Sequence, residues 1–440
     1  MSLVSLVIPP TDYSVELRYD QYAEAPLEGI TALRSTLVRS GHSVQVLDCR
    51  RAAEPLEWLM ASVNAEADLV GFTTFFDSFA FIEQASEKLK SLLPRVPVVV
   101  GGPLASGTPA CFVRETAADH VVVGEGERTL EQLVGCLSAS QTCQSVPGIV
   151  FAEPGGTMRD TGPAGVFDDL SEAGSLDWSY AKEWTSPGRF SFMYSVGRGC
   201  HGKCIYCCRP YAPRRFRRQQ QLFRDLQYLR EAWGMRSVLL NDSDFVQGNP
   251  YLDEHLRVLA RLGVDWGCFT IPKGLTPELL KRLSGAGCKN LRVGVEVLDD
   301  SALRANHRPV TTDEIMKNLQ VLETSDLDKI TCYLLLGLPG ETERALERTV
   351  AVFRERQRLV PRAFFFIPLP GSVVYERLRE TLRFDEPSYL RSLNSSSLVS
   401  PSQFAEHLCS VPTRVLEDAH EELRRIEQAR LQQSSCAITV

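Results

Sequence analysis

The sequence predicts an α/β protein made of two consecutive domains, each built on a parallel sheet. Two series of apolar runs alternate with segments of helical periodicity, and a cluster of cysteines lies between the two series. With 440 residues the chain exceeds one ordinary domain of roughly 150 residues. We expect a doubly wound domain over 1–145, a linker over 146–190, a partial (β/α)6 barrel over 191–371, and a mostly helical C-terminal extension over 372–440.

The N-terminal series predicts five strands, and continuous apolar runs such as Val98–Val100 are typical of strands buried on both faces. These predicted strands are Ser5–Pro9, Ser43–Asp48, Asp68–Phe75, Pro97–Gly101 and His120–Gly124. The first strand runs into Pro9 and Pro10 instead of a glycine-rich turn. Each proline removes a backbone donor, so a nicotinamide dinucleotide is not expected there.

The composition and net charge exclude several classes of protein. Hydrophobic residues make up 44% and charged residues 23%, which is globular, and the net charge of -7 argues against nucleic-acid binding. No apolar run reaches the roughly 18 residues of a membrane span. The N-terminus reads as a strand and not as a signal peptide. The 13 cysteines are too few for a disulfide framework in a chain of this length. We therefore expect a cytoplasmic protein without a membrane partner.

Two glycine-containing loops follow the fourth and fifth predicted strands, at Gly101-Gly102-Pro103 and Gly124-Glu125-Gly126. They resemble the loops of cobalamin-binding domains fused to radical enzymes, and the resemblance implies the same fold. Cobalamin binding stays open. The D-x-H-x-x-G element that supplies a cobalt ligand in many cobalamin proteins is missing, and Leu104 stands where many relatives carry a histidine. The glycines could also serve only tight turns.

The cysteine cluster follows the predicted strand Phe192–Val196. Thiolates are the ligands of iron–sulfur clusters, and a short loop lets them converge on one cluster. Three close cysteines without an obvious fourth indicate a cluster with one open iron. A zinc site completed by His201 and a redox pair of Cys204 and Cys207 are the alternatives.

The pattern C-x3-C-x-Tyr-C over residues 200–207 resembles the radical S-adenosylmethionine (SAM) superfamily. The resemblance implies a [4Fe–4S] cluster held by Cys200, Cys204 and Cys207, with SAM on the open iron. Reductive cleavage of SAM would then give a 5′-deoxyadenosyl radical that abstracts a substrate hydrogen. Tyr206 holds the family's aromatic position near the adenine. Cys208 is an alternative third ligand.

The resemblance extends through a series of strand–helix units whose chemistry belongs at the carboxyl ends of the strands. The further predicted strands are Ser237–Asn241, Gly267–Ile271, Asn290–Val297, Ile330–Gly337 and Ala363–Ile367. By resemblance, the cofactor-binding candidates are Tyr206, Gly294, Glu296, Pro339 and Pro368. The catalytic candidates are the loop carboxylates Asp242, Asp244 and Glu341, which could hold a proton or balance a substrate cation.

An arginine-rich stretch over 209–218 follows the cysteines. It could dock an acidic electron donor such as flavodoxin or ferredoxin, because complementary charge speeds encounter. One arginine could instead reach the SAM carboxylate. For most of them we favour the simpler interpretation, a solvated helix start.

Two reactions fit this organisation. The whole plan resembles the radical SAM diol dehydratases that deoxygenate aminoglycoside sugars at C3′ in apramycin-type antibiotic biosynthesis. That resemblance implies dehydration of a vicinal diol in a cationic, paromamine-like amino sugar, completed by a separate nicotinamide-dependent reductase. The alternative is a cobalamin-dependent radical SAM C-methyltransferase acting on a natural product. Either reaction takes a small-molecule substrate.

Overall fold

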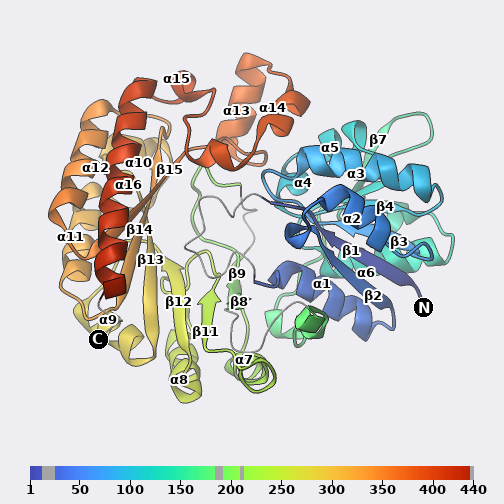
Figure 1. Cartoon of the computed structure of the whole chain (residues 1–440), viewed down its shortest axis with the longest axis horizontal. Coiled ribbons are helices and arrows are strands. Elements are labelled where there is room, and N and C mark those ends of the chain that lie inside the picture. The colour runs from blue at the N-terminus through green and yellow to red at the C-terminus, as the bar shows by residue number, and fades with distance from the viewer. Residues whose placement is uncertain (12–24, 184–191, 209–212, 437–440) are drawn as a thin grey trace. The chain divides into compact units, whose positions relative to one another are not determined.

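The computed structural model describes residues 1–11, 25–183, 192–208 and 213–436 (Figure 1). The chain forms two compact units. The first comprises residues 1–186, 207–210 and 369–395, and the second comprises 187–206, 211–368 and 396–440. Each unit contains one large sheet with mainly parallel strands. The predicted α/β class with two consecutive parallel-sheet domains is confirmed.

The first unit is built on a sheet with the order β2-β1-β3-β4-β5-β6-β7. Its strands are β1 (Leu3–Ile8), β2 (Ser43–Asp48), β3 (Leu69–Phe72), β4 (Val98–Val100), β5 (His120–Val122), β6 (Ile149–Ala152) and β7 (Met158–Asp160). Strands β1 to β5 run parallel, in the order of a doubly wound fold. Their apolar runs are buried because helices cover such a sheet on both faces.

The helices in the N-terminal part of the first unit pack in two groups. They are α1 (Glu28–Arg39), α2 (Pro55–Ser62), α3 (Phe79–Leu92), α4 (Pro103–Gly107), α5 (Pro109–Glu115) and α6 (Gly126–Ser138). Helix α1 contacts α6, and α2 contacts α3. The rings of Phe79 and Phe112 join α3 to α5 at a centroid distance of 5.0 Å.

The stretch 146–190 was expected to be a linker, but its described part, residues 146–183, adds two strands to the first sheet. Its strand β6 pairs antiparallel with β5, and β7 pairs antiparallel with β6. The glycine pair at 155 and 156 turns this hairpin with positive φ angles. The side chain of Trp178 is fully buried within the same unit. The glycines and prolines of this stretch therefore make turns between short strands and do not mark a free connector.

The C-terminal extension is divided between the units. Helices α13 (Val373–Leu382) and α14 (Glu386–Ser392) belong to the first unit, where α14 contacts α3 and α5. The carboxylate of Glu386 accepts hydrogen bonds from Thr108 and Tyr375, each at 2.8 Å. Arg391 pairs with Glu83 at 2.6 Å. Residues 396–440 belong to the second unit.

The second unit is a parallel sheet in which each strand lies beside its predecessor, in the order β8-β11-β12-β13-β14-β15. Its strands are β8 (Phe192–Tyr194), β11 (Ser237–Leu240), β12 (Asp265–Thr270), β13 (Cys288–Glu296), β14 (Lys329–Leu336) and β15 (Leu359–Phe365). Its helices are α7 (Gln219–Trp233), α8 (Leu252–Leu262), α9 (Pro277–Gly285), α10 (Asp300–Ala305), α11 (Thr312–Glu323), α12 (Glu343–Glu355), α15 (Ala405–Leu408) and α16 (Thr413–Cys436). This is the predicted partial barrel, and the C-terminal helix α16 covers β15 beside α12 (Figure 1).

Within the described part of the chain, every helix is too short or too polar to cross a lipid bilayer.

Candidate active site

The cysteine loop leaves the second sheet after β8. It passes through the short strand β9 (Gly197–Arg198), which pairs antiparallel with β10 (Arg215–Phe216). The carboxylate of Asp242, at the end of β11, accepts hydrogen bonds from the backbone of Val196, at 3.1 Å, and Gly197. A Cβ at residue 197 would lie 2.8 Å from that carboxylate. The hydrogen bonds to Asp242 therefore fix the backbone of the residues that precede the cysteine loop.

Two of the predicted ligand thiols face the same space. The backbone N–H of Gly202 donates to Sγ of Cys200 at 3.2 Å. A Cβ built on Gly202 would lie 3.3 Å from the Cys200 sulfur and 3.7 Å from the Cys204 sulfur. A side chain at 202 would thus occupy the space between the thiols. This arrangement of soft ligands around an open position fits an iron–sulfur cluster.

Cys207 and the alternative Cys208 lie in the stretch 207–210, which belongs to the first unit. There, the carbonyl oxygen of Cys208 is 3.6 Å from the Cβ position of Gly371. Among the residues that the structure describes, no three cysteine, histidine or acidic side chains already share one metal position. The choice of third ligand therefore stays a prediction from the motif.

The Gly294–Glu296 motif lies at the carboxyl end of β13, where the strand is irregular. Its pairing register with β14 shifts between Gly294 and Glu296, and Glu296 has a φ of +66°. Such a bulge re-aims a side chain. A Cβ on Gly294 would lie only 2.8 Å from a Glu296 carboxylate oxygen, so glycine lets the carboxylate fold back over the strand end. Burial raises the pKa of Glu296, and Arg308 opposes the rise.

Arg308 is a residue of this site that sequence reasoning missed. Its Nη1 lies 3.8 Å from the Cys204 sulfur, and its Nη2 donates to the carbonyl of Gly294 and lies 3.4 Å from the Glu296 carboxylate. Its side chain is 9% exposed. It lies in a polar loop after α10. Arginines are common in such loops, so nothing in the neighbouring sequence indicates that this one belongs to the site. Only the fold brings it beside the cysteines.

The predicted aromatic residue, Tyr206, lies next to these groups. Its hydroxyl is buried with no hydrogen-bond partner, and its ring meets Phe366 edge-on at 6.3 Å. Burial, followed by the charge of Glu296, raises the pKa of Tyr206 well above its usual range. The loop is fastened by Asn306, whose carbonyl accepts from the backbone of Ile205 at 3.2 Å. A buried hydroxyl left unpaired is the kind of group that a bound cofactor satisfies.

The two predicted prolines lie on the loops that follow the neighbouring strands β14 and β15. The carbonyl of Pro339 accepts a hydrogen bond from the side chain of Asn306 at 2.7 Å, which ties the loop after β14 to the cysteine loop. Pro368 follows β15, two residues beyond Phe366. Direct contact of either proline with SAM stays a prediction.

The remaining predicted carboxylates are bound within their own loops. Asp244 accepts from the backbone of Gln247 at 2.9 Å and from the hydroxyl of Thr270 at 3.0 Å. Glu341 accepts from the backbone of Gly337 at 2.6 Å, and burial raises its pKa to about 7. Both side chains are buried. Their contacts shape the loops, and a catalytic role for Asp242, Asp244 or Glu341 stays a prediction.

The arginine stretch differs from the expected solvated helix start. Arg209 lies outside the described residues, but Arg215 and Arg217 are buried, and Arg214 donates to the carbonyls of Asp244 and Gln247. Helix α7 begins only at Gln219. For these three arginines the expectation was wrong, because Arg215 and Arg217 are buried next to the β9–β10 pairing and the partly buried Arg214 is held by backbone carbonyls.

Neighbouring residues of the chain pack tightly against the two glycine loops of the first unit. A Cβ on Gly102 would lie 2.7 Å from the backbone nitrogen of Thr74. The Thr74 hydroxyl accepts from the backbone of Leu104 and Ala105, at 3.1 Å each. The Ser106 hydroxyl accepts from the backbone of Gly124, which joins the two loops.

These loops test the fit of a corrinoid. The residues are small and the loops lie at the carboxyl ends of β4 and β5, where doubly wound domains bind ligands. Leu104 is buried at the position where many cobalamin domains carry a histidine. The described loops are therefore compatible with cobalamin only in a binding mode in which residue 104 supplies no histidine ligand to cobalt.

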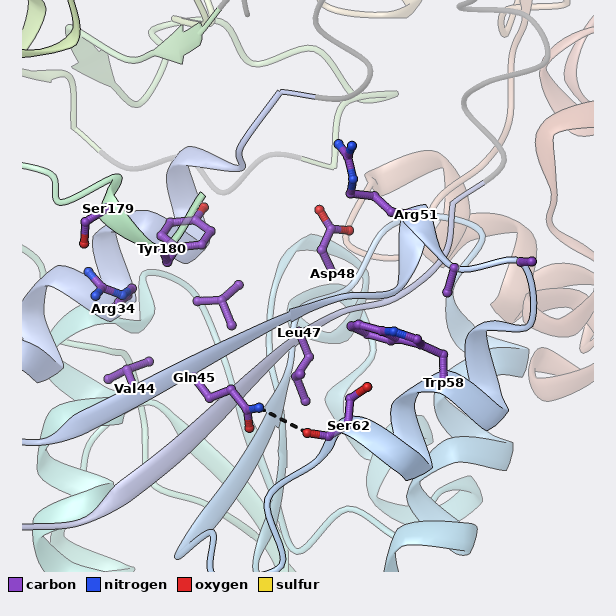
Figure 2. A pocket seen from close by; sticks show the side chains of 13 residues that line it. Arg34, Val44, Gln45, Leu47, Asp48, Arg51, Trp58, Ser62, Ser179 and Tyr180 are labelled. Atoms are coloured by element: carbon purple, nitrogen blue, oxygen red, sulfur yellow. Dashed lines mark hydrogen bonds between the residues drawn. The ribbon is translucent and has the colours of Figure 1, made fainter. Parts of the chain in front are cut away.

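A cavity of about 920 Å³ runs along the edge strand β2 of the first unit (Figure 2). Its wall includes Asp48 from β2, Trp58 from α2, Arg34 from α1 and the ring of Tyr180 (Figure 2). No predicted ligand or catalytic residue lines it, so we assign it no part in the reaction.

The chain thus combines a doubly wound unit with glycine loops and a partial barrel in which two cysteine thiols lie near the carboxylate of Glu296. Two family models match the chain accordingly. The model described as the radical SAM superfamily matches residues 194–353, and the B12 binding domain matches residues 24–134.

Individual proteins agree with this organisation. The chain is 24% identical over 384 residues to an uncharacterized methyltransferase of Pyrococcus horikoshii, covering 85% of this chain and 82% of that protein. It is 24% identical to the cytidylyl-2-hydroxyethylphosphonate methyltransferase of Streptomyces wedmorensis, covering 72% and 67%.

Among solved structures, the radical SAM methyltransferase TsrM from Kitasatospora setae, with cobalamin and a [4Fe-4S] cluster bound, aligns with a TM-score of 0.70. The alignment covers 97% of this chain and 89% of TsrM at 17% identity. At this identity the likeness establishes the fold.

Proposed function

We propose that the chain is a cobalamin-dependent radical SAM methyltransferase that acts on a carbon atom of a small molecule. The observation that carries the proposal is the joint presence of a B12 binding domain and a radical SAM domain in one chain. Two relatives that cover most of the chain are named methyltransferases, which supports this reaction over the dehydration that the sequence resemblance favoured.

In this proposal Cys200, Cys204 and Cys207 hold the cluster, and the loops at 101–107 and 123–126 hold cobalamin. When bound, the cluster supplies the electron that cleaves SAM, and cobalamin supplies a methyl carrier. The chain's own contribution near the cluster is a partly buried carboxylate, Glu296, which is 14% exposed and stands at the bulge in β13. An anion there would bind the ammonium group of SAM through a charge-assisted hydrogen bond.

The surroundings of Glu296 favour a site that excludes water. The hydroxyl of Tyr206 and Nε of Arg308 are both buried without a hydrogen-bond partner. Apolar neighbours such as Phe366 cover one side. A dry pocket strengthens each ionic contact with the cofactor and protects a radical from quenching.

One observation favours the second candidate, dehydration of a vicinal diol at C3′ of an amino sugar without cobalamin. A Cβ on Gly107, at the end of α4, would lie 2.3 Å from the carbonyl oxygen of Pro370. Both residues belong to the first unit. The chain itself therefore fills the space beside one of the glycine loops, which leaves less room for a corrinoid.

The deciding experiment is anaerobic reconstitution with iron, sulfide and hydroxocobalamin, followed by desalting and metal analysis. The methyltransferase predicts about four irons and one cobalt per chain. It also predicts that a methyl-deuterated SAM passes its label to an acceptor molecule. About four irons without cobalt would contradict it and favour the dehydratase.

The dehydratase then has its own assay. A paromamine-like amino sugar, SAM, a strong reductant and a nicotinamide-dependent reductase would give a 3′-deoxy sugar together with 5′-deoxyadenosine. Absence of iron after reconstitution would reject both reactions.

A further inference from the structure

We propose that Arg308 is a positioning residue that raises the reduction potential of the iron–sulfur cluster through its contact with Cys204, and that holds Glu296 at the end of β13. The proposal rests on the radical SAM assignment and does not depend on which substrate is transformed.

The contacts of Arg308 converge on three elements of the second unit. One arm of the guanidinium reaches the sulfur of Cys204 at 3.8 Å, and the other donates to the carbonyl of Gly294 and approaches Glu296 at 3.4 Å. The cysteine loop, the bulged end of β13 and the loop after α10 are thus joined by one side chain. Its burial, with 9% of the side chain exposed, keeps water from screening these contacts.

A lysine could not make the same set of contacts. The planar guanidinium carries five N–H groups in a fixed fork, whereas an ammonium group is a compact point charge. Two acceptors lie on one side of the fork and the sulfur on the other. Glycine at 294 leaves room for these contacts, because a Cβ there would lie 3.0 Å from Nη2 of Arg308 and 2.8 Å from the Glu296 carboxylate.

The electrostatic consequence follows from the charge of the cluster. Reduction adds one electron to the cluster and its thiolate ligands, and the electron comes from an external low-potential donor. Hydrogen bonds to the ligand sulfurs and nearby positive charge stabilise the reduced state more than the oxidised state. The carboxylate of Glu296 acts in the opposite direction, and Arg308 stands between the carboxylate and the sulfur to offset it.

The test is an anaerobic redox titration of the reconstituted protein with titanium(III) citrate, followed by the electron paramagnetic resonance signal of the reduced cluster. Arg308→Gln is expected to lower the midpoint potential relative to the unaltered chain. Arg308→Lys keeps the charge but loses the fork, and should give a smaller decrease. Because the titration follows the cluster and not a product, failure of the methyltransferase proposal would not affect it.

Gly294→Ala is the second variant, and its Cβ crowds both the Glu296 carboxylate, at 2.8 Å, and Nη2 of Arg308, at 3.0 Å, without removing either charge. Because it changes the positions of both charges relative to Cys204, it should shift the midpoint potential, and it decides the question if Arg308→Gln does not assemble a cluster. Arg358→Gln is the control, because the guanidinium of Arg358 donates to the carbonyls of Ser325 and Leu327, away from the cysteine loop. An unchanged potential in both Arg308→Gln and Gly294→Ala, or in Gly294→Ala alone if Arg308→Gln holds no iron, would overturn the proposal.

Discussion

The loops at the carboxyl ends of the two parallel sheets carry different kinds of side chain. The second sheet ends in charged and sulfur-bearing groups, where Arg308 contacts both Cys204 and Glu296 and the hydroxyl of Tyr206 is unpaired. The described loops at the ends of β4 and β5 in the first sheet present glycines that pack on the chain itself, with buried Thr74 capping α4. Both sheets carry loops at the carboxyl ends of their strands, and among the described residues the contacts that join a thiol, a carboxylate and a guanidinium lie at the end of the second sheet.

The largest effect expected from this comparison comes from the thiols. Cys204→Ala should abolish cluster assembly and 5′-deoxyadenosine formation, because an iron–sulfur cluster needs each thiolate ligand. Cys207→Ala should do the same, whereas Cys208→Ala should keep about four irons per chain. Iron analysis after anaerobic reconstitution measures all three. If Cys208→Ala loses its iron while Cys207→Ala retains it, the alternative third ligand is correct.

The next effect concerns the partly buried carboxylate. Glu296→Gln keeps the size of the side chain but removes its charge, and should weaken SAM binding by about ten-fold, the equivalent of one charge-assisted hydrogen bond. Equilibrium binding of SAM to the reconstituted protein measures the change. The exposed Glu343, at the start of α12, provides the control variant Glu343→Gln, which should bind SAM normally. Equal affinity in both variants would show that Glu296 does not contact SAM.

The glycine loops can be tested by adding a single methyl group. Gly107→Ala brings a Cβ against the carbonyl of Pro370, a backbone atom that cannot swing away. We expect it to destabilise the first unit by about 1–3 kcal/mol, the usual range for overpacking. Gly135→Ala is the control, because nothing lies within 4 Å of its Cβ in α6, and it should stabilise the protein by about 0.5 kcal/mol. Chemical denaturation measures both, and similar midpoints would contradict the close packing at Gly107.

The last expected effect depends on pH. Burial raises the pKa of Glu341 to about 7, above its value in an unfolded chain. The folded state therefore favours the protonated carboxyl, and this stabilisation is complete below about pH 4 and is lost as the pH rises through 7. Glu341→Gln removes that loss and still accepts the hydrogen bond from Gly337.

Between pH 5 and pH 8 the unaltered chain should lose about 2 kcal/mol more stability than the Glu341→Gln variant. Parallel stability curves for the two proteins across this range would show that the carboxyl at 341 titrates normally.

Much of the fold could be predicted from the sequence because the signals are local. Buried parallel strands read as apolar runs, so the strand Val98–Val100 was within reach of pattern analysis. The hairpin β6–β7 was not, because its strands are short and surrounded by glycine and proline. A pattern of chain breakers cannot distinguish a free connector from short strands at a sheet edge.

The sequence by itself determined the class of chemistry in this protein, because the spacing of Cys200, Cys204 and Cys207 on one loop is a local property. Through the resemblance to the radical SAM superfamily it also singled out Gly294 and Glu296 as candidates. The tertiary structure alone decided that Arg308 joins them, and that Arg215 and Arg217 are buried instead of solvated. The physical reason is that a long side chain obtains its role from the residues the fold brings within its reach, and these lie in other parts of the chain.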